Sequence, residues 1–268
     1  MLQLDSVSKT YETGSGENVR AVDNVSMDIR AGEIASIIGP SGCGKSTLFG
    51  IISGLIGEYS GTVSLNGAPV KGIQPDVGIV FQEESTFPWR TTLENVCFGL
   101  ESQGIPKRER EESGRYFIKL AGLEGFENSY PSELSGGMRQ RTAIARTLAV
   151  KPKLLLLDEP FGALDEQTRM LMGDQLLKIW EQTGQTILLV THSITEAVQL
   201  SSRVAVMSFR PGRIKRMIDI DLPRPRSADV IASDAFGRLR GMIWNELCEE
   251  ASRGMKKSEE ELQKRVRH

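Results

Sequence analysis

Gly39-Pro40-Ser41-Gly42-Cys43-Gly44-Lys45-Ser46-Thr47 is the stretch of sequence that decides the fold. It has the pattern G-x-x-x-x-G-K-[ST] and lies between an apolar run, Ile34 to Ile38, and a helical stretch, Thr47 to Ser53. Glycines let backbone N–H groups turn inward around phosphate oxygens at the positive end of a helix dipole. In such a loop Lys45 reaches the β- and γ-phosphates and the Ser46 hydroxyl is a ligand for Mg²⁺. All nine residues are therefore predicted to bind a nucleotide.

The segments on the N-terminal side of position 80 predict mainly strands. They are short, apolar and β-branched, and turn sequences separate them: Val19 to Val22, Val25 to Ile29, Ile34 to Ile38, Thr62 to Leu65 and Val77 to Phe81. Asn66-Gly67 predicts a hairpin. From about Thr91 to Val150, apolar and charged residues mix at helical spacing, with Pro106 and Pro131 where helices begin or break.

The sequence after Pro152 predicts a parallel sheet covered by helices on both faces. A strand over Leu154 to Leu157 is followed by a helix from about Glu166 to Gln182 and a strand over Thr186 to Val190. Two further strands, a helix and a charged, frayed tail follow: Val204 to Met207, Ile214 to Ile220, Asp234 to Glu250, and Ala251 to His268. The predicted fold class is α/β.

Composition and charge exclude several classes of protein. The formal net charge is -2 and the pI is about 5.9, so no global positive field exists to hold nucleic acid. The three cysteines form no Cys-x-x-Cys, so we expect neither a disulfide framework nor a zinc site, and a reducing compartment fits best. The first residues lack the pattern of a signal peptide, and the apolar runs are far shorter than the roughly 20 residues that span a bilayer.

Two acids follow the apolar run that ends at Leu157. Asp158 and Glu159 come directly after this run, and ligands of parallel sheets bind at the carboxyl ends of strands. Adjacent strand residues point to opposite sides, so the two acids need not share one role. We expect Asp158 to assist in holding Mg²⁺ and Glu159 to act as the base for an attacking water. A solvated turn is the alternative.

A second glycine pair narrows the choice of family. Leu134-Ser135-Gly136-Gly137-Met138-Arg139-Gln140-Arg141 closely resembles the signature sequence of ATP-binding-cassette (ABC) ATPases. Ser135 can cap a helix that starts near Gly136, where free N–H groups make a second anion site. The resemblance covers about residues 1 to 220. It implies a phosphate-loop ATPase domain with a mostly parallel core sheet, an N-terminal antiparallel β subdomain, and a helical subdomain at about 87 to 150 that carries the signature.

Other family motifs follow in the expected order. By resemblance, Tyr11 is the aromatic that stacks on adenine, and Gln82 is the glutamine that contacts Mg²⁺ and senses the γ-phosphate. The segment Gly162-Ala163-Leu164-Asp165 resembles the loop that contacts the opposite subunit, although Asp165 also suits a helix cap. His192 resembles the switch histidine at the γ-phosphate. The catalytic set implied is Lys45, Glu159 and His192, and the implied Mg²⁺ ligands are Ser46, Gln82 and Asp158.

The family also implies partners. Two ABC subunits meet head to tail, and each ATP lies between the phosphate loop of one and the signature of the other. A homodimer, or a pair with a similar subunit, is therefore implied, together with transmembrane permease subunits and, indirectly, a solute-binding protein. The implied location is the cytoplasmic face of the membrane. Residues 221 to 268 form a C-terminal extension outside the ATPase domain.

Three looser features resemble the nitrate, sulfonate and taurine importer branch. They are the Glu83 to Val96 segment with Phe87 and Trp89, the Asp221 to Arg226 segment, and the helix that contains Trp244. Phe87 and Trp89 suit a dock for a permease helix, or else pack inside the helical part. The basic segments Arg210 to Arg216 and Arg224 to Arg226 are expected to be solvated, with contact to anionic lipid headgroups as the alternative. The sequence does not identify the solute.

Three alternative functions are weighed against the importer. An exporter ATPase uses the same cassette. A soluble ABC ATPase acting on DNA or the ribosome usually carries a long coiled coil or two cassettes, and the sequence shows neither. A phosphate-loop GTPase is opposed by the signature and by the absence of Asn-Lys-x-Asp.

Overall fold

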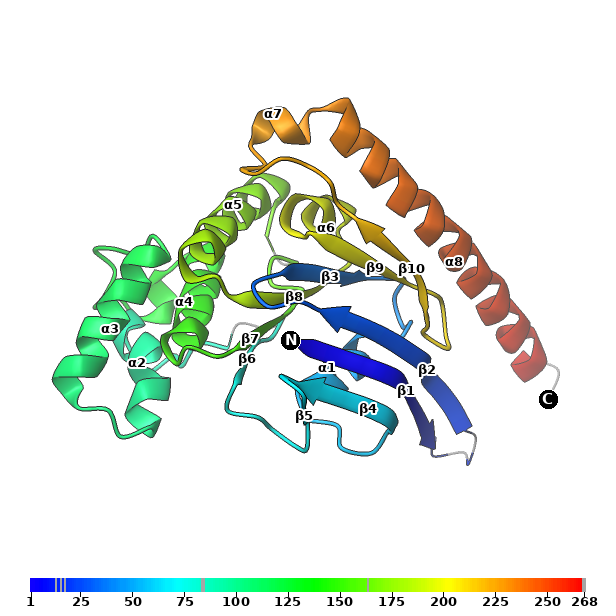
Figure 1. The fold of residues 1–268 in the computed structure, drawn as a ribbon, viewed down its shortest axis with the longest axis horizontal. Helices are drawn as coiled ribbons and strands as arrows, with labels where there is room; N and C mark the ends of the chain where they lie inside the picture. The colour runs from blue at the N-terminus through cyan, green and yellow to red at the C-terminus, as the bar shows by residue number, and fades with distance from the viewer. Residues whose placement is uncertain (13, 15, 17, 83–84, 163, 267–268) are drawn as a thin grey trace. The chain divides into compact units, whose positions relative to one another are not determined.

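The computed structural model describes residues 1 to 266 except 13, 15, 17, 83, 84 and 163, with side chains up to Gly254. The chain divides into two compact units, one of Met1–Gln74 with Val190–His268 and one of Pro75–Leu189. Figure 1 labels the helices and strands along the chain.

An antiparallel sheet forms one part of the first unit. Its strand order is β2-β1-β4-β5, with β1 at Leu2–Glu12, β2 at Asn18–Ile29, β4 at Ser60–Leu65 and β5 at Ala68–Pro69. The predicted Asn-Gly hairpin is confirmed between β4 and β5, where Asn66 and Gly67 have φ angles of 52° and 80°. Strand β1 was not predicted, because register shifts between Leu4 and Thr10 interrupt its alternation of buried and exposed residues.

A second group of strands in the same unit supports the phosphate loop. Strand β3 (Ile34–Ile38) is buried along its whole length and pairs in parallel with β9 (Arg203–Met207), which pairs antiparallel with β10 (Ile214–Asp219). Helix α1 (Lys45–Ile52) follows β3, and α6 (Ile194–Leu200) follows the histidine at position 192. Strand β3 has the expected ends, and β9 and β10 each differ from the expected strand by one residue at one end. The expected segments Val19 to Val22 and Val25 to Ile29 are one continuous strand, β2.

The C-terminal extension is more helical than the sequence predicts. After the short helix α7 (Ala228–Ile231), α8 (Asp234–Val266) continues well beyond Glu250, so the expected frayed tail is wrong in the structure (Figure 1). The stretch after Glu250 contains no proline and is rich in Lys, Glu, Gln and Arg, which favour helix at nearly every position. Phe236 and Ile243 of α8 are buried in a cluster with Ile218, Ile220 and other apolar residues.

In the second unit, strands β8 (Thr186–Thr191), β7 (Leu154–Asp158) and β6 (Val77–Val80) are neighbours in that order. The last two residues of β8 belong to the first unit. Strands β6 and β7 pair in parallel, as the apolar run before Asp158 predicts, and Leu154 to Leu157 are completely buried. A run buried on both faces is typical of a central parallel strand.

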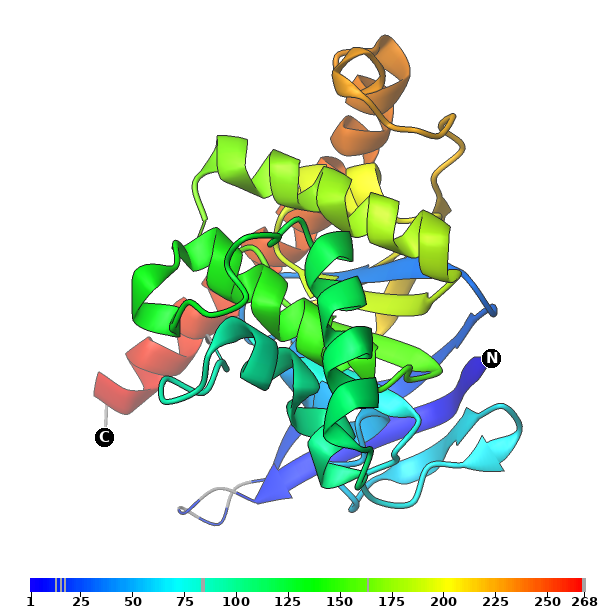
Figure 2. The same ribbon diagram turned by 90° about the vertical axis from the view of Figure 1, so that its left-hand side faces the viewer.

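Helices make up the rest of the second unit: α2 (Thr92–Ser102), α3 (Lys107–Leu120), the 3-10 turn η1 (Pro131–Glu133), α4 (Gly136–Ala149) and α5 (Glu166–Thr183). Helices α2, α3 and α4 pack against one another, and Figure 2 looks onto them. Pro106 stands at the N-cap of α3 and Pro131 begins η1, so both prolines mark helix starts as predicted.

Burial raises the pKa of Cys97 on α2 to about 11.

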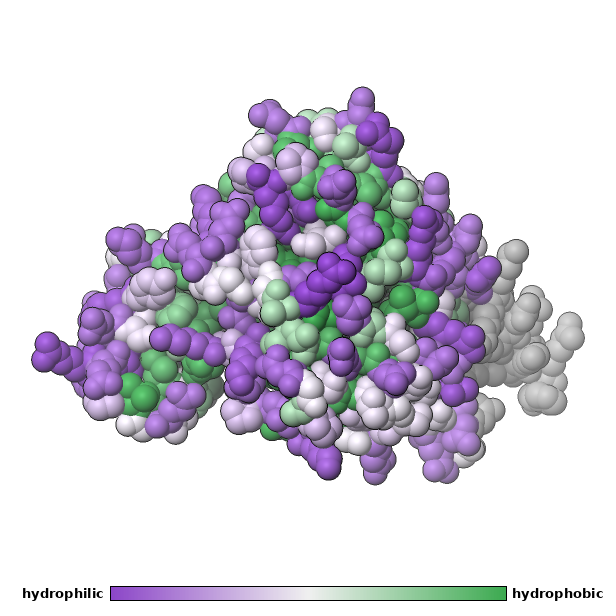
Figure 3. All heavy atoms as spheres, viewed as in Figure 1, coloured by the Kyte–Doolittle hydropathy of each residue, from purple (hydrophilic) through white to green (hydrophobic). Residues whose placement is uncertain are grey.

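On the face drawn in Figure 3, hydrophilic side chains predominate and hydrophobic ones form separate groups. Within the described part of the chain, none of the helices combines the length and the apolar character needed to cross a membrane.

Candidate functional site

The phosphate loop ends in a helix start that has no side-chain cap. Gly44 occupies the N-cap of α1 with a φ of 104°, a left-handed conformation that glycine adopts without strain. Lys45 is 8% exposed, and its Nζ donates hydrogen bonds to the carbonyl oxygens of Gly39 at 2.7 Å and Pro40 at 3.2 Å. The ammonium therefore lies inside the curve of the loop, next to the first N–H groups of α1.

Two glycines of this loop are required by packing. A Cβ on Gly39 would lie 2.7 Å from Cys43 Sγ, and one on Gly44 would lie 2.7 Å from the Ala21 carbonyl oxygen. Cys43 is completely buried beneath the loop, and burial raises the pKa of its thiol. The loop thus keeps its shape only with small residues at these positions.

Tyr11 lies beside the phosphate loop, although 36 residues separate it from Thr47. Its hydroxyl donates to Thr47 Oγ1 at 3.5 Å, and the Lys9 ammonium lies 5.1 Å from its ring centroid. The side chain is 39% exposed, so much of the ring is open to a ligand, and Ser46 in the first turn of α1 is exposed as well. The first unit thus brings together Tyr11 and residues 39 to 47, as the resemblance implies.

His192 stands between β8 and α6, and its side chain is exposed. The turn around it is fixed by hydrogen bonds. Thr191 Oγ1 donates to Glu196 Oε2 at 2.6 Å and accepts from the Ser193 amide at 3.0 Å, and the Ser193 hydroxyl caps α6 by accepting from the Glu196 amide. Thr191 and Glu196 are both buried. The hydrogen bonds that fix the backbone of this turn are therefore on the side that faces the protein interior.

In the second unit, Asp158 is the last residue of β7 and Glu159 follows it; both are half-buried. Glu159 has a φ of 44°, a left-handed conformation that costs a non-glycine residue about 1–3 kcal/mol. Its carbonyl oxygen accepts from the Gly162 amide at 3.0 Å. The sequence argument from strand alternation is therefore wrong in its reason, because a turn rather than an extended strand sets the direction of Glu159.

The signature helix begins as predicted. Ser135 is the N-cap of α4, and its hydroxyl accepts from the Met138 amide at 3.3 Å. Gly137 is buried, and a Cβ placed on it would lie at ordinary contact distances, 3.4 Å from Thr168 Cγ2 and 3.5 Å from Met172 Sδ. The start of α4 therefore lies against the start of α5.

The other predicted residues of the second unit are placed as follows. Gln82 is exposed after β6, while Glu83 and Ala163 lie outside the described residues. Asp165 caps α5, accepting from the Thr168 amide at 2.9 Å and the Thr168 hydroxyl at 2.7 Å. These hydrogen bonds lower the pKa of Asp165. The expected helix-capping role of Asp165 is confirmed.

Phe87 and Trp89 have different surroundings. The Phe87 ring lies 4.5 Å from the Phe98 ring and 4.9 Å from the Arg146 guanidinium, so it packs within the helical part. Trp89 is 71% exposed and is supported on one side by Phe87, with 5.7 Å between ring centroids. Phe87 therefore follows the packed alternative, while for Trp89, which is exposed, docking of a permease helix stays a prediction.

The basic segments are paired rather than merely solvated. Arg213 bonds to Asp23, and Arg216 and Lys215 bond to Glu246 on α8. Arg226 is only 2% exposed, so the expectation of a solvated face or a lipid contact is wrong for this residue. The sequence analysis missed it because nothing in Arg-Pro-Arg distinguishes a buried arginine from an exposed one.

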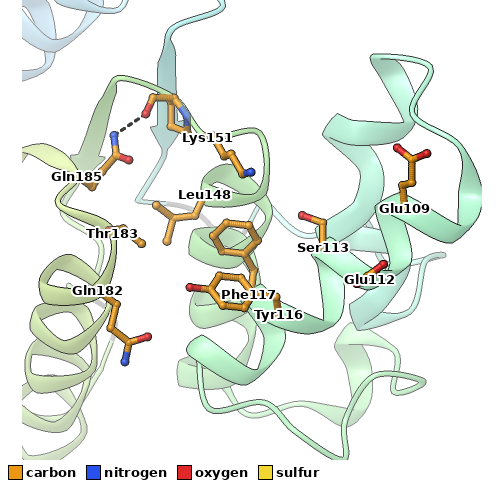
Figure 4. A pocket seen from close by; sticks show the side chains of 11 residues that line it. Glu109, Glu112, Ser113, Tyr116, Phe117, Leu148, Lys151, Gln182, Thr183 and Gln185 are labelled. Carbon is orange, nitrogen blue, oxygen red and sulfur yellow. Dashed lines mark hydrogen bonds between the residues drawn. The ribbon is translucent and has the colours of Figure 1, made fainter.

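A cavity of about 750 Å³ lies in the second unit (Figure 4). One wall is the face of α3 that carries Glu112 and Tyr116, the floor includes Phe117 and Leu148, and Gln182 lies across from them. No predicted site residue lines this cavity. In the described part of the chain no cluster of three or more His, Cys, Asp or Glu side chains could hold a metal. The predicted Mg²⁺ ligands do not form such a cluster, since they are a hydroxyl, an amide and one carboxylate.

Comparison with known proteins gives a consistent family. A family model described as ABC transporter matches residues 22–162, which is more than half of the chain. An uncharacterised ABC transporter ATP-binding protein of Methanocaldococcus jannaschii is 50% identical over 255 residues, 95% of this chain and 94% of its own. A nitrate import ATP-binding protein of Synechocystis is 46% identical, with 83% of each chain covered. A taurine import ATP-binding protein of Roseobacter denitrificans is 44% identical, with 80% of each chain covered.

A solved structure agrees with the fold. A dimeric ATP-binding cassette in a post-hydrolysis state, bound to ADP and Pi, superposes with a TM-score of 0.71 at 36% sequence identity. The match covers 82% of this chain and 99% of the other. The predicted ATPase fold, with an antiparallel sheet, a mostly parallel core sheet and helices, is confirmed, and β10 is the antiparallel edge strand of the core sheet.

Proposed function

Because the chain belongs to the ABC transporter family and is an ATP-binding, ATP-hydrolysing protein of that family, we propose that it powers import of a small anionic solute through a separate membrane permease. Relatives named for nitrate and taurine import support the direction, and both solutes contain an anionic group, since nitrate is an anion and taurine carries a sulfonate beside its ammonium. The proposed location is the cytoplasmic face of the membrane, where the permease holds the protein. Nucleic acid is not a proposed partner, given the net charge of -2.

The nucleotide is proposed to bind on the first unit. The N–H groups at the start of α1 and the Lys45 ammonium face into one loop, where they suit the β- and γ-phosphates. The exposed ring of Tyr11 suits stacking on adenine, which contributes about 1–3 kcal/mol in comparable contacts. Residues 39 to 47 and Tyr11 therefore bind and orient ATP.

The proposed Mg²⁺ ligands are Ser46, Gln82 and Asp158. Their hydroxyl, amide and carboxylate oxygens are the hard ligands that Mg²⁺ prefers, and all three side chains are exposed or half-buried. The ion, when bound, neutralises charge on the phosphates.

Hydrolysis is proposed to depend on Glu159 and His192. The Glu159 carboxylate accepts the proton of the attacking water, and the strained turn at Glu159 fixes the direction of that side chain. His192 donates a hydrogen bond to the γ-phosphate from the held turn before α6. Neither role requires a covalent intermediate on the protein.

One observation carries the proposal: the chain has two glycine-containing helix starts, at α1 and α4, and each can bind an anion. We propose that two copies pair head to tail, so that Ser135, Gly136 and Gly137 of one copy close over the γ-phosphate held by the other. A similar cassette that forms a dimer supports this pairing. Closure excludes water other than the one that attacks.

The permease is proposed to contact the exposed Trp89, which Phe87 supports from within. A large aromatic with an apolar body and one polar atom is a frequent anchor at protein interfaces. The solute-binding protein acts indirectly, because it meets the permease and not this subunit.

The Glu159→Gln variant tests the chemical step. It should keep ATP binding, lose at least about 100-fold in turnover, and accumulate as an ATP-bound dimer, because general-base catalysis contributes about 10²–10⁴-fold. Glu181→Gln, an exposed change on α5, is the matched control and should behave as wild type. Phosphate release and size-exclusion chromatography with ATP measure both effects. Wild-type turnover of Glu159→Gln would remove this residue from its role.

The transport proposal is tested on the reconstituted complex. ATP turnover should rise when the permease, the solute-binding protein and the correct anion are all present in vesicles, and the anion should accumulate on the side of this subunit. Movement of the anion in the opposite direction would instead establish an exporter. Stimulation by nucleic acid without any permease would favour the soluble alternative.

A further inference from the structure

The C-terminal end of α6 is satisfied by two arginines from the C-terminal extension. The last carbonyl groups of a helix have no partner within the helix. The Arg226 guanidinium donates to the carbonyl oxygens of Val198 at 2.9 Å, Gln199 at 3.0 Å and Ser201 at 2.6 Å, and Arg224 donates to Leu200 at 2.9 Å. Four successive carbonyls at this helix end are therefore bonded by residues that lie more than 20 positions later in the chain.

Arg226 has an unusual environment for a charged side chain. It is 2% exposed and also donates to the Ile220 carbonyl oxygen at 3.1 Å. These hydrogen bonds all go to backbone carbonyl oxygens, and the charged group that acts on its pKa is Arg224 rather than a carboxylate. The negative end of the α6 dipole is the compensating partner. Burial lowers the pKa of Arg226 to about 10, with a contribution from Arg224, so the side chain keeps its charge at neutral pH.

Helix α6 is short enough to transmit this restraint. It has seven residues, and its N-cap Ser193 directly follows His192. At that end, Glu196 is bonded to Thr191, and Ala197 and Val198 are fully buried against the extension in one apolar cluster. A two-turn helix fixed at both ends moves as a rigid piece, so displacement of its C-terminal end also displaces the turn that carries the histidine.

We infer that Arg226, supported by Arg224, is a positioning residue for ATP hydrolysis, because it fixes α6 and thereby the His192 turn. The inference rests on the proposed function, since it requires His192 to act at the γ-phosphate. In this role the arginines of the Arg-Pro-Arg segment bind backbone carbonyl groups rather than lipid headgroups.

The test is a double-mutant cycle on the full chain. Arg226→Met should lower kcat about tenfold, with KM for ATP changed less than twofold, because misplacement of a catalytic group by about 1 Å can cost up to about 100-fold. Arg226→Lys should recover part of kcat, since an ammonium can satisfy some of the carbonyls. In a His192→Ala background, Arg226→Met should cause no further loss of kcat.

Controls separate this role from a general loss of stability. Val63→Ala removes a buried side chain from β4 of the same unit, far along the chain from α6, and should lower the thermal midpoint without changing kcat below it. If Arg226→Met does not fold, Arg226→Lys and Arg224→Met carry the test, and each should lower kcat while the protein stays folded.

The outcomes distinguish the inference from the proposed function. If His192→Ala hydrolyses ATP at the wild-type rate, the proposed histidine role fails and the inference fails with it. If His192→Ala is slow but the arginine variants are not, only the inference fails. A loss of kcat for Arg226→Met that is equally large with and without His192 also overturns it, because the arginine then acts independently of the histidine.

Discussion

The helix starts of α1 and α4 look alike in sequence but differ in how their free N–H groups are used. Each lies at a pair of glycines, Gly42 and Gly44 just before α1 and Gly136 and Gly137 in the first turn of α4. At α1 the N-cap is Gly44, with no side-chain hydrogen bond and with Lys45 folded into the loop. At α4 the N-cap is Ser135, whose hydroxyl already accepts from the Met138 amide.

This difference indicates that the two helix starts bind phosphate with different strength and at different stages. The α1 start needs an anion to satisfy its N–H groups and supplies a cation to attract it, so it suits the primary binding of a triphosphate. At the α4 start the Ser135 cap already satisfies one N–H group, and the nearby Arg139 donates to the Leu134 carbonyl oxygen, so this start suits a weaker contact that forms last. A nucleotide site that closes and opens in each hydrolytic cycle can reopen more easily when one of its two helix starts binds the phosphates strongly and the other binds them weakly.

The largest expected effect comes from the cation. Lys45→Ala should reduce ATP turnover by at least about 100-fold and weaken ATP binding, since removal of one group that stabilises transition-state charge costs about 10²–10³-fold. Ser135→Ala should leave ATP binding to the single chain unchanged. Phosphate release and titration calorimetry measure the two properties. An equal loss of ATP affinity in Lys45→Ala and Ser135→Ala would contradict the proposed difference between the two helix starts.

A smaller effect separates the two sets of glycines. Gly44→Ala places a Cβ 2.7 Å from the Ala21 carbonyl oxygen at a left-handed φ and should lower the free energy of unfolding by about 3 kcal/mol. In Gly137→Ala the added Cβ makes only ordinary contacts, and alanine favours a helix. Its free energy of unfolding should therefore stay within about 1 kcal/mol of the wild-type value. Chemical denaturation measures both. A strongly destabilised Gly137→Ala would show that the α4 start is as tightly constrained as the α1 start.

The smallest effect concerns a third helix start, that of α5, whose cap can be protonated. The pKa of Asp165 is lowered by hydrogen bonds from Thr168, so the charged cap stabilises α5 fully above the ordinary carboxyl pKa. This stabilisation is lost as the pH falls through the lowered pKa. Hydrogen exchange of the Thr168 amide should therefore accelerate, relative to the intrinsic rate, in acid. Asp165→Asn should remove that pH dependence, and an unchanged profile would mean that another group is responsible.

The sequence predicted those parts of the fold that local patterns determine. The loop at residues 39 to 47, the strand before Asp158 and the Ser135 cap each depend on neighbouring residues, so they were predicted close to where the structure has them. The fully buried strands were also predicted, because a continuous apolar run indicates a strand that is buried on both faces of its sheet.

The rest depends on contacts between residues distant in sequence. Strand β1 was missed because its bulges interrupt the alternation, and the length of α8 was underestimated because a charged helix and a charged tail have the same composition. Arg226 is the clearest case. Its partners are carbonyl groups at the end of a helix that lies 25 to 28 positions earlier. Every residue has a backbone carbonyl, so the sequence does not identify the ones that Arg226 binds.

The placement of the three thiols has a practical consequence. Cys43 and Cys97 are buried and their pKa values are raised, so the reactive thiolate is scarce at both, while Cys248 on α8 is half-buried. A maleimide dye should therefore label Cys248 first and leave the nucleotide loop unmodified. The native chain thus offers a ready attachment point for fluorescence studies of its C-terminal helix, without removal of any cysteine.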